Sequence, residues 1–186
     1  MTTYNEISQK TDMYFLVLNI CVSIIFVVLI NKKIQETLVL DKYVLTRTTR
    51  ITVLFMHLKK CTVAVAPVFL SKIIADVLTS QLNIISDCIK LFWYGFSMAL
   101  TILIWILFLH LLQATKIQSK YIQFIFLVFL VVAQYASLYI PIFTIFVAGS
   151  VNYYSNPILW ITGKVILSIM LVMSNILAYR KHETLK

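Results

Sequence analysis

Residues 91–112, LFWYGFSMALTILIWILFLHLL, decide the fold class of this chain. They contain no Asp, Glu, Lys or Arg, and as a helix they would be about 33 Å long, slightly more than the hydrocarbon core of a bilayer. The stretch lacks the alternation of polar and apolar residues that is typical of a strand in a membrane barrel. Because a helix satisfies its own backbone hydrogen bonds in lipid, the sequence predicts a membrane-spanning helix here.

Four other apolar stretches are long enough to cross a bilayer. They are Met13–Ile30, Cys61–Thr79, Tyr121–Ala148 and Pro157–Tyr179. Of all 186 residues, 61% are hydrophobic and only 12% are charged, whereas soluble domains carry about 25% charged residues. We therefore expect one integral membrane domain over residues 1–186, an all-α, polytopic transmembrane helix bundle with five spans, in contact with membrane lipids and other membrane subunits.

The Lys and Arg residues are sorted to one side of the predicted spans. Of the sixteen, twelve lie in segments 31–60, 113–120 and 180–186, two lie in the segments on the other side, and two lie within spans. By the positive-inside rule, the amino terminus faces outward and the carboxyl terminus faces the cytosol. The formal net charge of +9 then reflects topology, so no nucleic acid is expected as a partner.

The composition also bears on where the protein resides. It is rich in Ile, Lys, Phe, Tyr and Asn and contains only three Gly residues. Such a bias towards AT-rich codons suits a bacterium of low GC content or an organelle genome. We expect a multi-pass protein of a bacterial cell membrane, with the inner membrane of an organelle as the alternative.

The fourth apolar stretch is too long for one straight span. Tyr121–Ala148 would extend about 42 Å as a helix, and Pro141 removes a helical hydrogen bond two-thirds of the way along it. The polar and aromatic segment 149–157 follows. This pattern predicts a kink and then a re-entrant segment after Pro141, which is tolerated in a membrane against protein or a water-filled cavity.

The longest segment between predicted spans is a basic cytosolic loop, residues 31–60. It contains the apolar octet Ile51–Leu58, which is too short to span and is predicted to be an interfacial helix. The residues just before the octet, Tyr43, Arg47 and Arg50, are candidates for docking a cytosolic partner. Attraction of the basic side chains to anionic lipid headgroups is the alternative interpretation.

Three charged residues fall inside the predicted spans. Lys72 and Asp76 are four residues apart and therefore share a helix face, and Lys164 lies in the last span. A charge in the bilayer costs several kcal/mol unless it is paired or hydrated, so these residues predict an intramembrane polar cluster lining an outward-facing cavity. The alternative is a local pair, with Lys164 extending its side chain to the outer headgroups.

Two histidines, His57 and His110, lie at similar depth near the cytosolic ends of different predicted helices. Two such residues are the axial ligands that a haem b iron would need. They suggest an alternative function, a structural or haem-binding membrane subunit of an electron-transfer complex. Under the main interpretation the protein has no cofactor and no metal site, and these side chains find water or headgroups.

Catalytic motifs are absent from the sequence. There is no HExxH zinc motif, no GxSxG nucleophile and no phosphate-binding GxxxxGK[ST] loop. Few polar residues converge in any predicted span. We therefore expect no catalytic residues, and a chain that is not itself an enzyme.

Three features taken together resemble a known family. A basic segment with Arg47 and Arg50 precedes a span, a proline-broken segment from Tyr139 to Pro157 precedes the last span, and the chain ends in the basic sequence 180–183. This layout, over most of residues 43–186, resembles the small permease subunits of bacterial ATP-binding-cassette exporters of the type-two class, including those for bacteriocin or peptide export. The resemblance implies a non-catalytic transporter subunit that docks a separate ATPase through Arg47 and Arg50.

Overall fold

The computed structural model describes residues 13–44, 50–79, 88–113, 119–137, 139–147 and 157–183. Within these ranges the chain forms five α-helices, one 3-10 helix and no strand. They are α1 (Met13–Val44), α2 (Arg50–Thr79), α3 (Cys88–Gln113), α4 (Ser119–Ala136), η1 (Pro141–Phe146) and α5 (Pro157–Glu183). The prediction of an all-helical fold is therefore confirmed.

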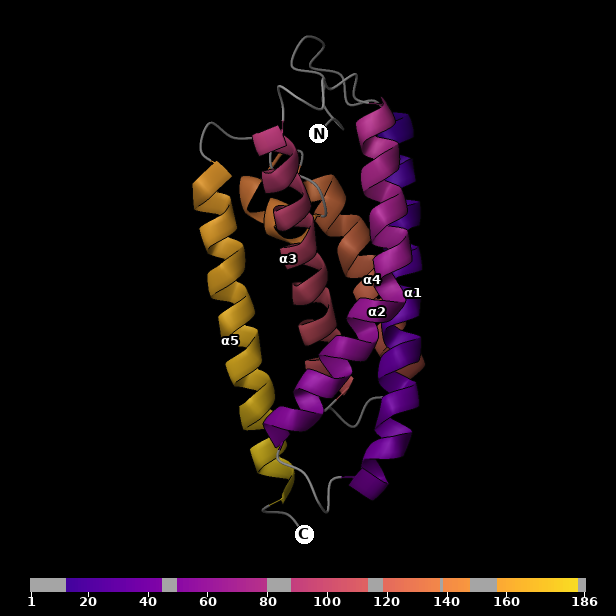
Figure 1. The fold of residues 1–186 in the computed structure, drawn as a ribbon, viewed down its shortest axis with the longest axis vertical. Helices are drawn as coiled ribbons and strands as arrows, with labels where there is room; N and C mark the ends of the chain where they lie inside the picture. Colours follow the sequence, from indigo (N-terminus) through magenta and orange to yellow (C-terminus); the bar gives the residue numbers. More distant parts are fainter. Residues whose placement is uncertain are drawn as a thin grey trace.

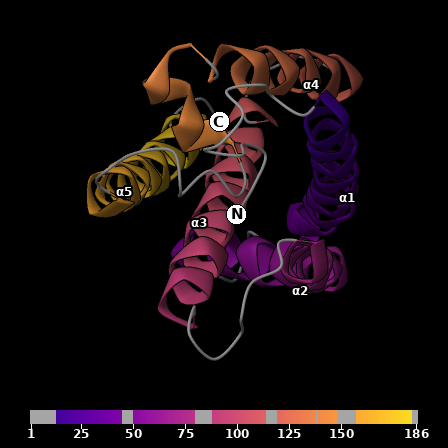
Figure 2. The same ribbon diagram turned by 90° about the horizontal axis from the view of Figure 1, so that it is seen from above.

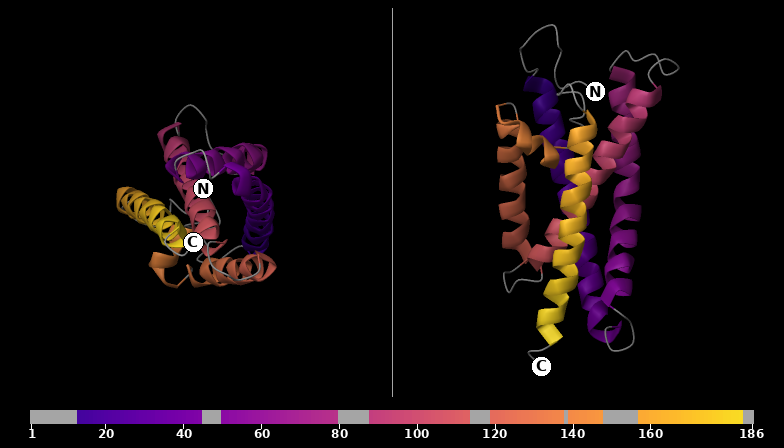
Figure 3. Two further views of the ribbon diagram at one scale, coloured as in Figure 1. Left: turned by 90° about the horizontal axis from the view of Figure 1, so that it is seen from below. Right: turned by 90° about the vertical axis from the view of Figure 1, so that its left-hand side faces the viewer.

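The helices form an elongated bundle in which consecutive helices run in opposite directions (Figure 1). Seen along the long axis, α3 lies in the middle, with α5 on one side of it and α4, α1 and α2 around the other (Figure 2). Figure 3 shows from a further side that α5 extends along the bundle. The end at which α1 begins is here called the upper end, and the end at which α5 finishes is called the lower end.

Three helices among the described residues are long and apolar enough to cross a membrane. The qualifying segments are Val17–Glu36 in α1, Phe92–Gln113 in α3 and Ile158–Ala178 in α5. α4 contributes a shorter apolar segment, Lys120–Ala136. Large apolar side chains also cover the outside of the bundle, which is the surface expected of a protein surrounded by lipid. These features indicate an integral membrane protein.

The predicted loop 31–60 is mostly helical. α1 continues to Val44 without a break, because residues 31–44 contain neither Gly nor Pro to end it. The octet Ile51–Leu58, predicted to be a separate interfacial helix, is instead the first part of α2 and is continuous with the apolar residues that follow. Residues 45–49, between the two helices, lie outside the described ranges.

Helix α2 is bent, as Figure 1 shows: its first half crosses towards α5, and its second half runs beside α1. Pro67 lies inside this helix. A proline lacks the amide hydrogen and its ring collides with the preceding turn, which is the usual cause of a helix kink. The bend allows one helix to pack against α1 in its upper half and to reach α3 and α5 in its lower half.

The predicted long fourth helix ends early. α4 stops at Ala136, whose carbonyl oxygen accepts the amide hydrogens of Tyr139 and Ile140 at 3.0 and 2.8 Å. Ile140 is extended, with φ −121° and ψ 104°, because the residue before a proline is sterically excluded from the helical region. Pro141 then opens η1, whose six residues are too few to cross a membrane. The predicted break at Pro141 is present, but the helix before it is shorter than expected.

The core of the bundle surrounds the lower two-thirds of α3. Trp105 is fully buried there, and its ring meets Phe26 of α1 edge to face at 6.2 Å. The Trp105 indole Nε1–H donates to the carbonyl oxygen of Phe146 at 3.1 Å, which satisfies a backbone group left open at the end of η1. The central helix therefore positions both the core and the broken segment before α5.

Candidate functional site

Polar side chains are buried inside this apolar bundle. Those that are buried are Ser23, Asn31, His57, Lys72, Ser97, Thr101, His110, Gln134, Ser137, Thr144, Lys164, Ser168 and Asn175. In a membrane protein, a buried ionisable side chain is costly and commonly marks a functional position. Two groups among the described side chains contain an ionisable residue that is hydrogen-bonded across helices. One joins α3 and α5, the other joins α2, α3 and α5, and together they form the candidate site.

The first group, here called the lysine site, consists of Lys164, Ser97 and Thr101. Lys164 of α5 is only 1% exposed. Its Nζ donates to the hydroxyl oxygens of Ser97 at 2.7 Å and Thr101 at 2.8 Å, with a longer contact of 3.5 Å to the Ser97 carbonyl. The two hydroxyl residues are one turn apart on α3, so they present their oxygens on one face. Neutral oxygens therefore replace water around this amino group.

No carboxylate neutralises the lysine site within the described side chains, where the single ion pair joins Lys33 and Glu36 of α1 at 2.6 Å. The Lys164 side chain is enclosed between two helices. The structure thus does not support the interpretation in which it extends to the outer headgroups. Hydroxyl groups compensate part of the desolvation of an amino group but do not cancel its charge. A charged amino group at the lysine site is therefore costly.

The predicted polar cluster of Lys72, Asp76 and Lys164 is only partly described. Lys72 of α2 is buried, at 8% exposed, and has an interaction partner of its own. Asp76 lies in α2, but its side chain is outside the described set. The hydrogen bonds of Lys164 go to α3 instead, to residues that the sequence analysis did not select. Their signal was two hydroxyl residues four apart in an apolar stretch, a spacing that also occurs in ordinary packing.

The second group, here called the histidine site, consists of His57, His110 and Asn175 and joins three helices. His57 Nδ1 of α2 lies 2.8 Å from His110 Nε2 of α3, and His110 Nδ1 lies 2.8 Å from Asn175 Oδ1 of α5. The side-chain amide of Asn175 donates to the carbonyl oxygens of Leu107 and Leu171 at 3.0 and 2.8 Å. All three polar side chains are at most 3% exposed.

The hydrogen bonds of Asn175 determine which atoms donate and which accept in the histidine site. Its NH2 group faces two carbonyl oxygens, so the oxygen Oδ1 must be the atom that faces His110. His110 Nδ1 therefore carries a hydrogen and donates it. In the neutral ring Nε2 is then an acceptor, so His57 donates its Nδ1 hydrogen to it. If both imidazoles are neutral, this arrangement of protons satisfies the two hydrogen bonds of His110 described above.

The two histidines do not fit the haem alternative in this arrangement. Axial ligation would place an iron and a porphyrin plane between the two rings. The ring nitrogens instead contact one another at a hydrogen-bonding distance of 2.8 Å, with ring centroids 5.0 Å apart and the planes inclined by 65°. In the described part of the chain, no group of three or more His, Cys, Asp or Glu side chains is placed to hold a metal ion.

A scan of protein-family models finds no match for this chain, and searches of curated proteins and of solved structures find no similar protein either. Its function is therefore inferred from the geometry of its own residues.

The histidine site has a neighbour on the last turn of α3. Gln113, one turn after His110, donates to Asn31 Oδ1 of α1 at 2.6 Å, and Asn31 Nδ2 donates to Gln123 Oε1 of α4 at 2.7 Å. Side-chain hydrogen bonds from this single turn of α3 therefore reach α1, α2 and α5 directly, and α4 through Asn31. The lower end of the bundle is held together by polar contacts.

Two of the three predicted docking residues lie at this same lower end. Tyr43 is in the last turn of α1 and Arg50 is the first residue of α2, while Arg47 falls in the segment outside the described ranges. The side chains of Tyr43 and Arg50 are also outside the described set. Figure 1 shows the end of α1, the start of α2 and the end of α5 at one end of the bundle. This is the end that the sequence assigns to the cytosol.

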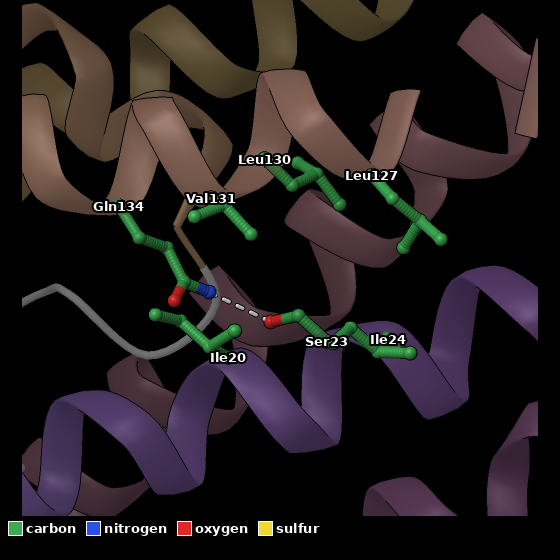
Figure 4. A pocket seen from close by; sticks show the side chains of 7 residues that line it. All are labelled: Ile20, Ser23, Ile24, Leu127, Leu130, Val131 and Gln134. Carbon is green, nitrogen blue, oxygen red and sulfur yellow. Dashed lines mark hydrogen bonds between the residues drawn. The ribbon is translucent and has the colours of Figure 1, made fainter. Parts of the chain in front are cut away.

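A shallow groove runs between α1 and α4 near Gln134 (Figure 4). Gln134 Nε2 donates to Ser23 Oγ at 2.7 Å, and Ser23 Oγ donates to the carbonyl oxygen of Asn19. The other walls are apolar, and the groove is too narrow to hold a water molecule. It is a seam between two packed helices and contributes nothing to the candidate site.

Proposed function

We propose that this chain is the non-catalytic transmembrane subunit of a membrane transporter, an exporter that works with a separate ATPase subunit. The observation that carries the proposal is Lys164, an ionisable side chain enclosed between α3 and α5 in a bundle with an apolar exterior. A buried charge in a membrane helix is expensive to keep and typically lies on the path of a solute or ion. The lysine site is where such a path would pass.

The proposal includes five membrane crossings, with the amino terminus outside and the carboxyl terminus in the cytosol. Three helices meet the length and hydropathy required, and the alternating direction of all five helices is what five crossings need. The basic residues of 31–60 and 180–186 then lie on one side, as the positive-inside rule requires. A bacterial cell membrane is the proposed location, with an organelle inner membrane as the alternative.

The shape of the lower end supports docking of a cytosolic partner. α1 continues for eight residues past Glu36, where its apolar segment ends, and this adds about 12 Å of helix. The exposed Lys59 and Lys60 lie nine and ten residues after Arg50, the first residue of α2. The ends of α1 and α2 would thus extend beyond the membrane, with Tyr43 and Arg50 near their tips.

The test is purification of the tagged chain from its source membrane in mild detergent, with identification of co-purifying proteins by mass spectrometry. We expect an ATPase subunit to be recovered with the wild-type chain. Replacing both Arg47 and Arg50 by Glu should reduce its recovery at least tenfold, because each arginine would lose a charged contact at the interface. A matched variant, Lys59→Glu with Lys60→Glu, makes the same change in charge and should keep the ATPase.

Two results would overturn this proposal. One is recovery of no ATPase with the wild-type chain, or equal recovery with the Arg47→Glu, Arg50→Glu variant. The other is a Soret absorption band in the purified protein that disappears in His57→Ala or His110→Ala, which would establish the haem-binding alternative. Recovery of redox subunits with no ATPase would point to a structural subunit of an electron-transfer complex.

A further inference from the structure

We propose that four lysines where α1 packs against α2 form a binding site for the headgroup of an anionic phospholipid, in the leaflet at the lower end of the bundle. The site, here called the basic seam, consists of Lys32 and Lys33 of α1 and Lys59 and Lys60 of α2. The proposal concerns a lipid ligand, and it requires neither an ATPase partner nor a transported solute.

The two pairs of lysines are brought together by the packing of α1 against α2 (Figure 2). Glu36 of α1 interacts electrostatically with Lys32 and Lys33 of its own helix, and also with Lys60 of α2. Cys61, the residue after Lys60, interacts in the same way with Lys33. The two helices thus place their lysines around one carboxylate.

The basic seam carries more positive charge than the described side chains around it neutralise. Lys33 pairs with Glu36 at 2.6 Å, which is the single ion pair in the described part of the chain. The other three lysines of the seam are exposed. One carboxylate therefore faces four ammonium groups, and the excess positive charge attracts an anion.

The positive-inside rule alone does not predict this cluster. The rule requires basic residues on one side of the membrane, but it does not require them on one pair of helices. At the lower end, Lys120 of α4 is the one lysine with a described side chain that lies outside the basic seam. Basic pockets between membrane helices are a known form of site for anionic lipid headgroups.

The level of the basic seam along the bundle favours a lipid over a soluble anion. The apolar segment of α1 ends at Glu36, and the apolar stretch of α2 begins directly after Lys60. Headgroup phosphates lie at this edge of the hydrocarbon core. One turn from the lysines, towards the middle of the bundle, Val28 is 42% exposed and Val63 is 66% exposed. A phospholipid can bind its phosphate at the ammonium groups while its acyl chains lie along this apolar surface.

The chemistry of the side chains also fits a phosphate group. An ammonium group is a compact charge on a flexible stem, and it donates up to three hydrogens to phosphate oxygens. Glu36 has the opposite effect, because its carboxylate competes with the phosphate for Lys33. The basic seam therefore contains four groups that favour an anionic lipid and one that opposes it.

Lipid binding is measured by electron-spin resonance on the full chain reconstituted into phosphatidylcholine vesicles. Trace spin-labelled phosphatidylglycerol or phosphatidylcholine is added, and the motionally restricted fraction gives the relative affinity for each lipid. At low ionic strength we expect the protein to prefer phosphatidylglycerol by about threefold or more. The preference should fall as NaCl is raised to about 1 M, where charges are screened beyond about 3 Å. Inorganic phosphate, added in place of chloride at equal ionic strength, should not displace the lipid.

Two variants each remove the lysines of one helix: Lys32→Gln with Lys33→Gln, and Lys59→Gln with Lys60→Gln. Each should lower the preference for phosphatidylglycerol about twofold or more, because the site needs both helices. The matched control is Lys120→Gln with Lys181→Gln, which removes two lysines of α4 and α5 on the same side of the bundle. The control should keep the preference of the unaltered chain.

A further variant, Glu36→Gln, tests the opposite sign. It removes the competing carboxylate, so the preference for phosphatidylglycerol should rise by about twofold. A general attraction of the membrane surface to the whole basic side of the protein would give equal losses in the control and in the lysine pairs of the seam.

Several outcomes overturn the proposal. They are equal binding of the two lipids by the unaltered chain, an unchanged preference in either lysine-pair variant, an equal loss in the control, and a preference that falls in Glu36→Gln. Displacement of the lipid by inorganic phosphate would also overturn it, because the site would then bind a soluble anion. The measurement on the unaltered chain remains decisive if a variant fails to fold.

Discussion

The lysine site and the histidine site both join α3 to α5, but they differ in how their buried polar groups are compensated. Lys164 and Asn175 are eleven residues apart on α5, which separates the two sites by about 16 Å. At the histidine site each hydrogen-bond donor described above meets a neutral acceptor, and these contacts do not require a charge on either ring. At the lysine site an amino group is surrounded by hydroxyl oxygens and has no acidic partner among the described side chains.

The difference indicates that the histidine site stabilises the fold and that the lysine site lowers its stability. A complete set of neutral hydrogen bonds in a buried site holds helices together, and loss of one partner leaves the others unsatisfied. An uncompensated cation lowers stability in any low-dielectric interior. Substitutions at the two sites should therefore change the free energy of unfolding in opposite directions.

The largest effect is expected from His110→Ala. The change removes both hydrogen bonds of the ring and leaves the Nδ1–H of His57 and the Oδ1 of Asn175 without their partner at this site. We expect the free energy of unfolding to fall by about 3 kcal/mol, measured by denaturation in mixed micelles. His182→Ala is the control and should leave stability unchanged. A loss below about 1 kcal/mol would remove the basis of the comparison, because the histidine site would then not be a stabilising contact.

An intermediate effect of opposite sign is expected from Lys164→Met. Methionine fills nearly the same space without a charge, and Thr101 Oγ1 keeps its own bond to the Ser97 carbonyl oxygen at 3.0 Å. We expect the free energy of unfolding to rise by about 1–2 kcal/mol in the same denaturation measurement. Lys120→Met, which replaces an exposed lysine on α4, should have no effect. A destabilised Lys164→Met protein would contradict the view that the lysine site lowers stability.

The smallest effect is expected from Gln134→Leu, at a buried polar residue that is only half satisfied. Gln134 Nε2 donates to Ser23, but Gln134 Oε1 has no partner within the described part of the chain. The substitution removes one good hydrogen bond and one unsatisfied oxygen, so the free energy of unfolding should change by less than about 0.5 kcal/mol. The same denaturation experiment measures it. A large fall in the free energy of unfolding would show that Gln134, like the histidine site, stabilises the fold through its hydrogen bonds.

The sequence predicted the helices better than their ends. Apolar runs located the cores of α3 and α5, because length and hydropathy are properties of a helix by itself. The continuation of α1 into residues 31–44 was missed, since a polar composition was taken for a loop although nothing in it stops a helix. The early end of α4 was also missed, because Ala136 is five residues before the proline that appeared to be the break.

The sequence predicted which ionisable residues matter but not their partners. Lys164, His57 and His110 were selected because charged or titratable side chains are rare in spans. Ser97, Thr101 and Asn175 were not, since hydroxyl and amide residues also occur in helix packing and their pairing depends on how α3 and α5 are rotated against each other. The predicted contact of Lys164 with Lys72 and Asp76 stays a prediction, because the Asp76 side chain is outside the described set.

The connection of α2 to α5 through the histidine site has a consequence for biogenesis. His57 is separated from His110 by 53 residues of chain, and His110 from Asn175 by a further 65. While the ribosome is still making the last helix, the earlier imidazoles have entered the lipid without the amide that orients them. Completion of the histidine site must therefore wait until α5 has been made, and a truncated chain that lacks α5 should be a preferred substrate for membrane proteases.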